Sequence, residues 1–446
     1  MFVNRYYDPD QSATSQMLTD LARGLAERGF EVHVVASRQL YDDPGMRLAA
    51  NEMLFGVETH RVATTRFGRG NLLGRAMDYA SFYVMCAVML LKLLRRGDVL
   101  IAKTDPPLLS ILAAPVAKIR RAVLINWQQD VFPEIASHLG ANPLPHWLDE
   151  RLRRLRDTSL RAAAINVVIG GRMSEYLAAR GVPKSKLCII ENWADEAAIR
   201  PRPASVNVLR ARLELADRFV VCYSGNLGRA HEFDTLLGAA EALREEPLFI
   251  FLIIGAGAKM EALKRGVAAR TLGNFRFLPL QPRNALEDSL AAADLHLVSL
   301  LPTLEGLIVP SKLYGILAAG RPLIFIGDDD GELGRVIRRA ECGRTVTVGD
   351  AKGLADSLRN LAEQPEVRAR MGARARRILC EEFSLQRAVG RWITLIETAR
   401  CAGYGSYEGA KPRSAELATQ LHPVDTHFSL PFADTRRSPL RKTGTP

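Results

Sequence analysis

Apolar and polar positions follow two alternating periods along the first half of the chain. Runs such as "FEVHVVAS" and "DVLIAKT" are largely apolar and are bounded by turn residues, a pattern typical of strands buried in a parallel sheet. Between them, "SATSQMLTDLARGLAERG" repeats apolar residues every three or four positions and ends at Gly29, which indicates an amphipathic helix. This alternation predicts a doubly wound α/β domain over residues 1–196.

The same alternation returns after a proline-rich segment at residues 197–207, which we expect to be a linker. "RFVVCYSGN" and "LFIFLIIGAG" are buried-strand patterns that run into glycine turns, and "FDTLLGAAEAL" between them has helical periodicity. We therefore expect a second Rossmann-like domain over 208–383, facing the first across a cleft. A helix is expected over 384–402, and residues 403–446, rich in Pro, Ser, Thr and Gly, are expected to form a disordered tail.

One apolar run, "YASFYVMCAVMLLKLLRRGD", allows two interpretations. Its apolar stretch of about 16 residues contains Lys92 and falls short of the ~20 residues that a membrane span needs. The run therefore predicts a helix that either faces the core or also rests on a membrane surface, with Lys92, Arg95 and Arg96 at anionic head groups.

Charge and cysteine content narrow the range of partners. Lys and Arg number 60 against 49 Asp and Glu, a formal net charge of +11, which suggests nucleic acid, anionic lipid or phosphorylated small molecules as partners. Acids are interleaved with the bases, so we expect no nucleic-acid partner. The six cysteines lack metal-binding spacing and are expected to be reduced thiols in the cytoplasm. No signal peptide is expected from "MFVNRYYDPDQ", no metal site is expected, and His33 and His296 are expected in the core.

The stretch "VPSKLYGILAAGRP" places a cation at the start of a predicted helix. Lys312 would lie at the positive end of the helix dipole, where a cation is disfavoured unless an anion binds there. Glycine turns at Gly225, Gly255 and Gly327 follow strands of the same domain, and ligands of open α/β sheets bind beyond the carboxyl ends of the strands. The pattern indicates a phosphate site; the alternatives are purely structural turns and a lysine that points into solvent.

Four motifs, taken together and in this order, resemble those of one enzyme family. They are "NRYYDPDQSATSQMLTDLARGLAERGFEVHVVAS", "NWQQDVFPE", "YSGNLGRAHEFDTLL" and "VPSKLYGILAAGRP". The set is similar to bacterial family 4 glycosyltransferases of the GT-B fold, and within them to colanic-acid and O-antigen fucosyl or N-acetylfucosaminyl transferases. The resemblance covers about residues 1–400. It implies a hexosyltransferase that uses a nucleotide-sugar, usually a UDP-sugar, with retention of configuration and with neither metal nor cofactor.

The resemblance also implies where the substrates bind. The C-terminal domain holds the donor, the N-terminal domain holds the acceptor, and the last helix, 384–402, crosses back onto the first domain. Lys312 is expected to bind the departing diphosphate, and Glu305 is expected under the transferred sugar, with a solvated loop acid as its alternative. The expected donor-binding residues are Gly225, Asn226, Gly228, Arg229, Gly255, Gly257, Pro310, Ser311, Lys312 and Leu313.

Two departures from the family pattern concern this site. Asn226 and His231 stand where many members have an arginine and a lysine, and Arg229 is the nearby cation that would compensate. Gly315 stands where the second of two paired glutamates is usual, so Glu305 lacks its partner.

On the acceptor side, Asp130 in "QQDVFPE" follows a predicted strand. It is expected to take the proton of the acceptor hydroxyl or to position that hydroxyl; the alternative is an aspartate that caps a turn. The loop after the first strand is expected to approach donor phosphate and acceptor, although Ser12 or Thr14 also suits a helix N-cap. The expected acceptor-side residues are Asp10, Ser12, Thr14, Ser15 and Glu134.

The leading hypothesis is a retaining glycosyltransferase of surface-polysaccharide biosynthesis that acts on a saccharide or a polyprenyl-diphosphate-linked acceptor. The basic helix predicted over 149–161 either faces solvent or contacts anionic lipid; in the second case the protein would be peripheral on the inner face of the plasma membrane. Two other classes stay open. One is a nonhydrolysing UDP-sugar 2-epimerase, although no convincing acid and base pair is found. The other is a non-catalytic nucleotide-sugar-binding protein.

Overall fold

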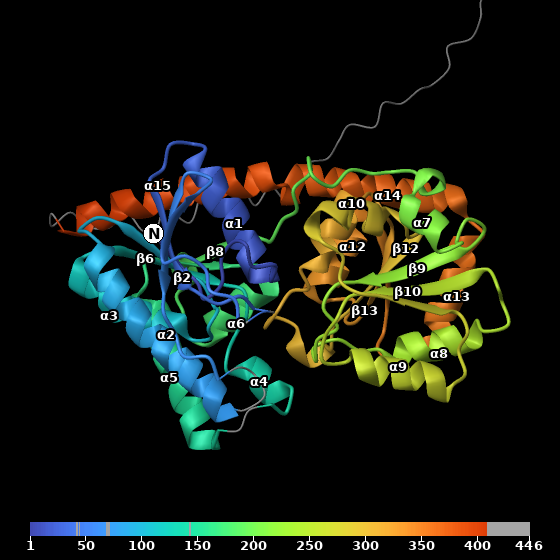
Figure 1. The fold of residues 1–446 in the computed structure, drawn as a ribbon, viewed down its shortest axis with the longest axis horizontal. Helices are drawn as coiled ribbons and strands as arrows, with labels where there is room; N and C mark the ends of the chain where they lie inside the picture. Colours follow the sequence, from blue (N-terminus) through green and yellow to red (C-terminus); the bar gives the residue numbers. More distant parts are fainter. Residues whose placement is uncertain (42, 44, 68–71, 142–143, 408–446) are drawn as a thin grey trace, which may run out of the picture.

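The structure is a computed structural model that describes residues 1–41, 43, 45–67, 72–141 and 144–407. Two α/β domains lie next to each other along the long axis of the molecule (Figure 1). Each domain is built on one sheet of mostly parallel strands covered by helices. The alternating apolar pattern therefore predicted the architecture of both halves correctly.

The N-terminal sheet has eight strands in the order β3-β4-β2-β1-β5-β6-β7-β8. Only β3 and β4 pair in antiparallel fashion, at one edge of the sheet. Its strands are β1 (Phe2–Val3), β2 (Val32–Ser37), β3 (Asn51–Leu54), β4 (Val57–Val62), β5 (Val99–Ala102), β6 (Val123–Gln128), β7 (Ile165–Val168) and β8 (Leu187–Ile189). Its helices are α1 (Ala13–Ala26), α2 (Leu72–Leu93), α3 (Leu109–Arg120), α4 (Glu134–His138), α5 (His146–Ala162) and α6 (Gly171–Ala179).

The edge hairpin β3–β4 is not predicted by the apolar pattern. Its first strand alternates exposed and half-buried residues, so it lacks the continuous apolar run of the buried strands. The two strands join at Phe55 and Gly56, whose φ values are +52° and +77°, and two-residue hairpin turns favour this left-handed conformation. The hairpin places Asn51 opposite His60.

The C-terminal sheet has six parallel strands in the order β11-β10-β9-β12-β13-β14. Its strands are β9 (Phe219–Ser224), β10 (Phe249–Ile254), β11 (Phe275–Leu278), β12 (Leu295–Ser299), β13 (Leu323–Ile326) and β14 (Gly343–Val346). Its helices are α7 (Val208–Arg212), α8 (Asp234–Ala242), α9 (Met260–Ala269), α10 (Leu286–Ala291), α11 (Lys312–Ala318), α12 (Glu332–Ala340), α13 (Ala351–Ala362) and α14 (Pro365–Ile378). The chain enters this domain through residues 197–207, which include a short 3₁₀ helix at Ala204–Val206.

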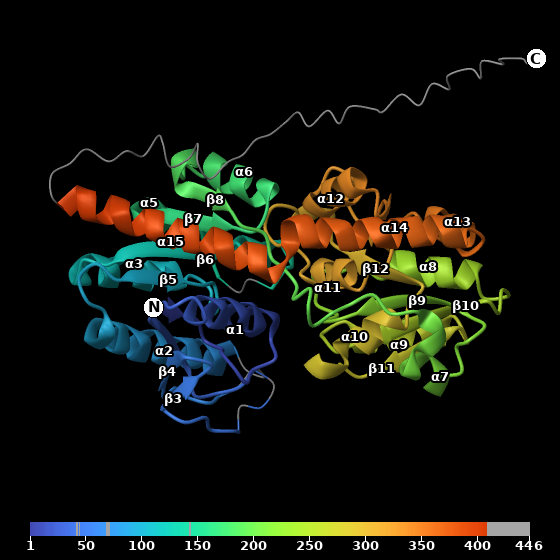
Figure 2. The ribbon, with the colours of Figure 1, turned by 90° about the horizontal axis from the view of Figure 1, so that it is seen from above.

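Helix α15 (Leu385–Tyr407) follows the C-terminal domain in the chain and packs on the N-terminal domain. Figure 2 shows α14 over the C-terminal domain and α15 over the N-terminal domain. Trp392 of α15 is fully buried, and its ring meets that of Trp127 from β6 edge-on at a centroid distance of 5.0 Å. The helix extends past the predicted end at residue 402; residues 408–446 of the expected tail lie outside the described part of the chain.

We expect Trp392→Ala to lower the free energy of unfolding of the N-terminal domain by about 3–5 kcal/mol, because it removes a fully buried aromatic ring and leaves a cavity. Urea denaturation followed by tryptophan fluorescence and circular dichroism measures the change. Glu397→Ala, at an exposed position of the same helix, is the matched control. A loss below ~1 kcal/mol for Trp392→Ala would show that α15 is not an integral part of this core.

Candidate active site

Two glycine turns form one wall of the candidate donor site, at the carboxyl ends of β9 and β10. Gly225 and Gly255 have φ values of +128° and +151°, which favour glycine. A Cβ on Gly255 would lie 2.0 Å from the Gly225 carbonyl oxygen, and one on Gly257 would lie 2.5 Å from Asn226 Oδ1. The turns are therefore packed backbone against backbone, and a larger residue would force them apart.

Lys312 begins α11, and its side chain lies over the Gly225 turn. The ammonium group donates hydrogen bonds to the Tyr223 hydroxyl, to His231 Nε2 (3.1 Å) and to the Asn226 carbonyl oxygen (3.4 Å). Burial lowers the pKa of Lys312 to about 7. In the described part of the chain no carboxylate forms an ion pair with it. Because an unpaired, partly buried cation is costly, this geometry suits an anionic ligand such as a phosphate.

The tautomer of His231 follows from its neighbours. Its Nδ1 faces the Ser299 carbonyl oxygen, which can only accept a hydrogen bond, so the proton resides on Nδ1 and Nε2 accepts from Lys312. Burial and the nearby Lys312 charge lower the pKa of His231 to about 3. The Gly228 carbonyl accepts the His231 N–H (3.3 Å). Where the family resemblance predicts a second cation, this chain therefore has a neutral ring that orients Lys312.

The other predicted donor residues divide between surface and core. Asn226 and Arg229 are exposed, and Arg229 has no acidic partner among the described residues. Ser311 precedes α11 without making a side-chain cap. Pro310 is buried, and Leu313 is 1% exposed and packs into an apolar core shared by the two domains. Arg229 is thus a second cation available to a ligand, whereas Leu313 is a packing residue.

Glu305 lies at the domain interface rather than in a solvated loop. Its carboxylate accepts the N–H of Glu332 at the start of α12 (3.1 Å), and the Glu332 carboxylate accepts the N–H of Arg172 in α6 (3.0 Å). Burial, helped by the charges of Asp328 and Glu332, raises the pKa of Glu305 to about 7. Glu305 is therefore coupled to the contact between the domains; its role under the transferred sugar stays a prediction.

Asp130 stands where the two domains touch. Its backbone pairs with Ile308 in an antiparallel bridge, and the N–H of the next residue donates to the Leu307 carbonyl oxygen (3.0 Å). Burial and the Asp105 carboxylate raise the pKa of Asp130 to about 6. A carboxyl group that ionises just below neutral pH is suited to accept a proton from a hydroxyl or to position it.

A cavity of about 240 Å³ opens beside Asp130 at the carboxyl ends of the N-terminal strands. Aromatic rings, carboxylates and guanidinium groups share its wall, and the Arg5 guanidinium lies 4.9 Å from the centre of the Tyr79 ring. Rings with polar groups between them suit a small polar ligand with apolar faces, such as a sugar. Its lining includes Tyr6, Thr14, Tyr79, Asp105, Asp130 and Phe132.

The loop after β1 is organised by Asp10. The Asp10 carboxylate accepts the N–H of Ser12 (2.9 Å), the Ser12 hydroxyl and the N–H of Tyr41. Ser12 is the N-cap residue of α1, but its side chain makes no capping hydrogen bond. Thr14 lines the cavity, while Ser15 is fully buried. Thr14 therefore faces the cavity, and Asp10 and Ser12 hold the backbone that leads to it.

Glu134 is an internal ion-pair partner. Its carboxylate accepts hydrogen bonds from the Arg156 guanidinium (2.8 Å) and the Tyr176 hydroxyl (2.9 Å), and its side chain is buried. It does not line the cavity beside Asp130. The basic helix predicted over 149–161 is α5, and Arg156 turns inward from it to this pair, so that helix is only partly a solvent-facing or lipid-facing surface.

Lys103 is a buried cation next to the candidate site, and the sequence reasoning missed it. It directly follows β5, and its ammonium group donates to the Thr14 carbonyl oxygen (2.6 Å) and lies 3.9 Å from the centre of the Trp127 ring. Burial lowers its pKa to about 7, against the opposing effect of Asp105 and Asp130. A lysine immediately after a buried parallel strand, in "LIAKT", is the signal that could have found it.

Two Rossmann-like domains, with a cation site on one and a polar cavity on the other, are the arrangement of the GT-B fold. The chain matches the family described as "Glycosyl transferase 4-like domain" over residues 13–193 and the family described as "Glycosyl transferases group 1" over residues 207–378. These matches together cover most of the chain. The protein is therefore a GT-B glycosyltransferase with a glycosyl transferase 4-like N-terminal domain and a group 1 C-terminal domain.

Known proteins agree with this assignment. The chain is 28% identical over 342 residues to the probable glycosyltransferase WbjE of Pseudomonas aeruginosa, covering 75% of this chain and 82% of WbjE. It is 27% identical over 347 residues to the putative colanic acid biosynthesis glycosyl transferase WcaI of Escherichia coli (strain K12), covering 74% and 83%. HepE of Anabaena, solved with UDP-glucose, has a TM-score of 0.67 at 15% identity, covering 89% of this chain and 98% of HepE. The GT-B fold expected from the sequence is confirmed.

The lowered pKa of Lys312 predicts a pH-dependent affinity for diphosphate. Lys312 is charged below about pH 7 and loses its proton above it, so the advantage of wild type over Lys312→Ala in UDP affinity should be largest near pH 6 and fall by about tenfold towards pH 9. Calorimetric titration of both proteins at each pH gives this ratio, in which the ionisation of UDP itself cancels. A ratio that is constant with pH would mean that Lys312 titrates outside this range.

Proposed function

We propose that the protein transfers a sugar from a UDP-sugar to a saccharide or polyprenyl-diphosphate-linked acceptor during surface-polysaccharide biosynthesis, with retention of anomeric configuration. The observation that carries the donor half is the Lys312 ammonium, which lies over the glycine turn after β9 without a carboxylate partner among the described residues. HepE binds UDP-glucose, and WcaI is named for colanic acid biosynthesis; both relatives support the proposed substrate classes.

Lys312 would act on the leaving group. As the bond between sugar and diphosphate breaks, negative charge grows on the departing oxygen, and a cation fixed beforehand at that point stabilises the transition state more than the ground state. His231 and Tyr223 fix the ammonium group. Its hydrogen bond to the Asn226 carbonyl, at 3.4 Å, is the longest of the three and is the one that a phosphate oxygen would replace. In this proposal the protein needs no metal at the diphosphate, because Lys312 and Arg229 supply the charge.

Asp130 would act on the acceptor. With a pKa of about 6, it is mostly ionised at neutral pH and can accept a hydrogen bond from the acceptor hydroxyl that attacks the sugar. It lines the cavity on the N-terminal domain and bridges to the segment that leads into α11. Glu305 is proposed to contact the transferred sugar from the opposite domain once the donor is bound.

The experiment that tests the donor site is calorimetric titration with UDP, GDP and ADP in the presence of EDTA, on wild type and Lys312→Ala. We expect selective UDP binding that weakens at least tenfold in the variant, together with a fall in sugar transfer of about 10²–10³-fold. Lys264→Ala, an exposed lysine on α9, is the matched control and should leave both unchanged. Failure to bind any of the three nucleotides, or near-normal turnover of Lys312→Ala, would overturn the proposal.

A lipid-linked acceptor lies in a membrane, so the proposed function requires a surface of the protein that faces the membrane. Helix α2 has the composition of such a surface. Its inner side packs against the sheet, where Phe82, Cys86 and Leu90 are fully buried. The helix is nonetheless apolar and long enough to meet the criteria for a membrane span, with most of its apolar stretch outside the core. We propose that this outer face rests on anionic lipid at the inner surface of the plasma membrane, with the exposed Lys92, Arg95 and Arg96 at the head groups. The exposed stripe is Leu73, Met77, Val84, Val88 and Leu91.

Replacing Val84 and Val88 together by Glu should weaken binding to anionic phospholipid vesicles by at least about tenfold, because two apolar contacts are lost and two repelled charges are added. Cosedimentation with the vesicles measures the change. Val206 and Val208 on the other domain are equally exposed, 70% and 71% against 62% and 57%, so their double replacement by Glu is the matched control. Equal loss of binding in both double variants would indicate a non-specific charge effect and would count against α2 as the docking surface.

A further inference from the structure

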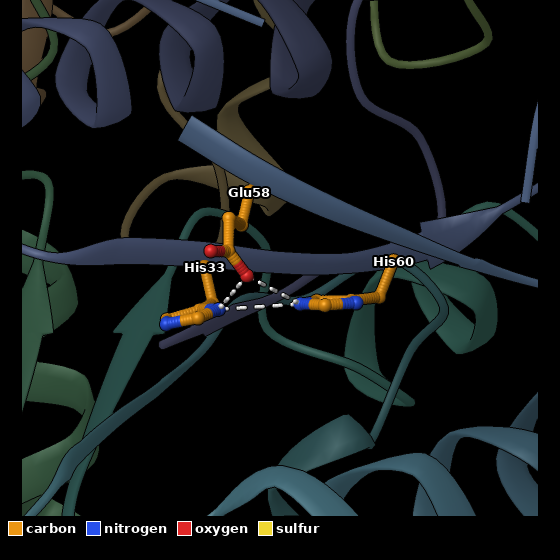
Figure 3. A group of neighbouring side chains, drawn as sticks. All are labelled: His33, Glu58 and His60. Atoms are coloured by element: carbon orange, nitrogen blue, oxygen red, sulfur yellow. Dashed lines mark hydrogen bonds and ion pairs between the residues drawn. The ribbon is translucent and has the colours of Figure 1, made fainter. Parts of the chain in front are cut away.

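Three side chains at the edge of the N-terminal sheet bring electron-rich atoms together far from the candidate active site. His33 on β2 and Glu58 and His60 on β4 point towards one another (Figure 3). His33 Nδ1 lies 3.2 Å from His60 Nε2 and 3.2 Å from Glu58 Oε2, and His60 Nε2 lies 3.7 Å from the same carboxylate oxygen. His33, expected in the core, is therefore a partly exposed member of a cluster.

The strand register produces this cluster. His33 and Glu58 are direct partners across the parallel pair β2–β4, and His60 follows Glu58 by two residues, so all three side chains project from the same face of the sheet. His33 and Glu58 are the second residues of their strands and His60 stands at mid-strand, whereas the cavity beside Asp130 lies at the carboxyl ends. The cluster is thus separate from the machinery proposed for sugar transfer.

The outer nitrogens of both rings are already engaged. His33 Nε2 lies 2.9 Å from Glu31 Oε1, and His60 Nδ1 lies 3.2 Å from Asn51 Oδ1. Carboxylate and amide oxygens accept hydrogen bonds, so each ring holds its proton on the outer nitrogen when it is neutral. The two inner nitrogens then present lone pairs to each other and to the Glu58 carboxylate, and a positive charge between the three is needed to relieve their repulsion.

The spacing of these atoms suits a tetrahedral transition-metal ion. Zinc bonds of about 2.0–2.1 Å at a tetrahedral angle imply ligand separations of about 3.3–3.4 Å, close to the observed 3.2, 3.2 and 3.7 Å. The ring planes differ by 13°, and a modest turn of each ring would direct its lone pair to a common centre. Outer hydrogen bonds from ligating histidines to a carboxylate or an amide are the usual second shell of such sites.

We propose that His33, Glu58 and His60 bind one divalent transition-metal ion of the zinc type, with Glu31 and Asn51 as supporting residues and water as the fourth ligand. Two imidazoles and a carboxylate match the ligand preference of Zn²⁺. Glu58 is half-exposed, which gives the ion access from solvent. The ion would tie the edge hairpin β3–β4 to β2 and so stabilise the N-terminal domain, without taking part in sugar transfer.

The test uses the full chain without an affinity tag, in a background in which the exposed Cys380 and Cys401 are replaced by Ser so that surface thiols do not bind metal. Co²⁺ is titrated first, because tetrahedral Co²⁺ absorbs visible light strongly, and Zn²⁺ is then added as competitor. We expect one equivalent of tetrahedral Co²⁺, its displacement by Zn²⁺, and a metal-dependent rise in melting temperature. If the titration finds no stoichiometric Co²⁺ site, the proposal is overturned. The three side chains would then be held together by a shared proton.

Substitutions test whether these residues form the metal site. His33→Gln and Glu58→Gln should each weaken Zn²⁺ binding by at least about 100-fold, and Glu31→Gln by about tenfold. His146→Gln, an exposed histidine at the start of α5, is the matched control and should bind as wild type does. Melting in EDTA checks folding, since the variants should then melt like the metal-free parent protein. Unchanged binding in His33→Gln and Glu58→Gln would overturn the assignment.

Discussion

The candidate active site depends on one backbone contact between the domains. The loop after β6 meets the segment ahead of α11, where Asp130 pairs with Ile308, and this contact lies on an apolar core to which both domains contribute. The contact places Asp130, at the carboxyl end of the N-terminal sheet, against Ile308 of the C-terminal domain. Lys312 follows four residues after Ile308. Helix α15 reinforces the arrangement from outside, because the chain that completes the second domain returns to the core of the first.

The site is marked by ionisable groups whose pKa values have moved towards neutrality. Burial lowers the pKa values of Lys103 and Lys312 to about 7 and raises those of Asp130 and Glu305 to about 6 and about 7. Partial burial of charge without full pairing costs stability, so folding alone does not favour it. By contrast, Glu134 and Arg156 form a closely paired buried couple, which is the arrangement expected of a structural role. This difference supports the proposal that the first four groups serve a ligand, whereas Glu134 and Arg156 serve the fold.

Polar and ionisable side chains gather at both ends of the N-terminal sheet. The carboxyl ends of its strands surround the polar cavity, while the amino ends of β2 and β4 hold the His33, Glu58 and His60 cluster. Arg61, on the opposite face of β4 from His60, donates to the Asp8 carbonyl (2.5 Å) in the loop that leads to Asp10. The edge hairpin therefore links the two ends of the sheet, and stiffening it at one end would also steady the acceptor-side loop.

By itself the sequence determined the two-domain α/β architecture, the glycine turns after the strands and the place of Lys312 at a helix start, because buried strands, turns and helix starts are local patterns that can be read along the chain. It also indicated Asp130, from its place after a strand. Only the tertiary structure decided that His231 is a neutral partner of Lys312, that Glu134 is buried in an ion pair, and that Lys103 reaches the Thr14 loop. The His33 cluster likewise required the pairing of two distant strands, in which His33 lies opposite Glu58, 25 residues further along the chain. Such contacts depend on register and burial between distant segments, and no local pattern of residues encodes them.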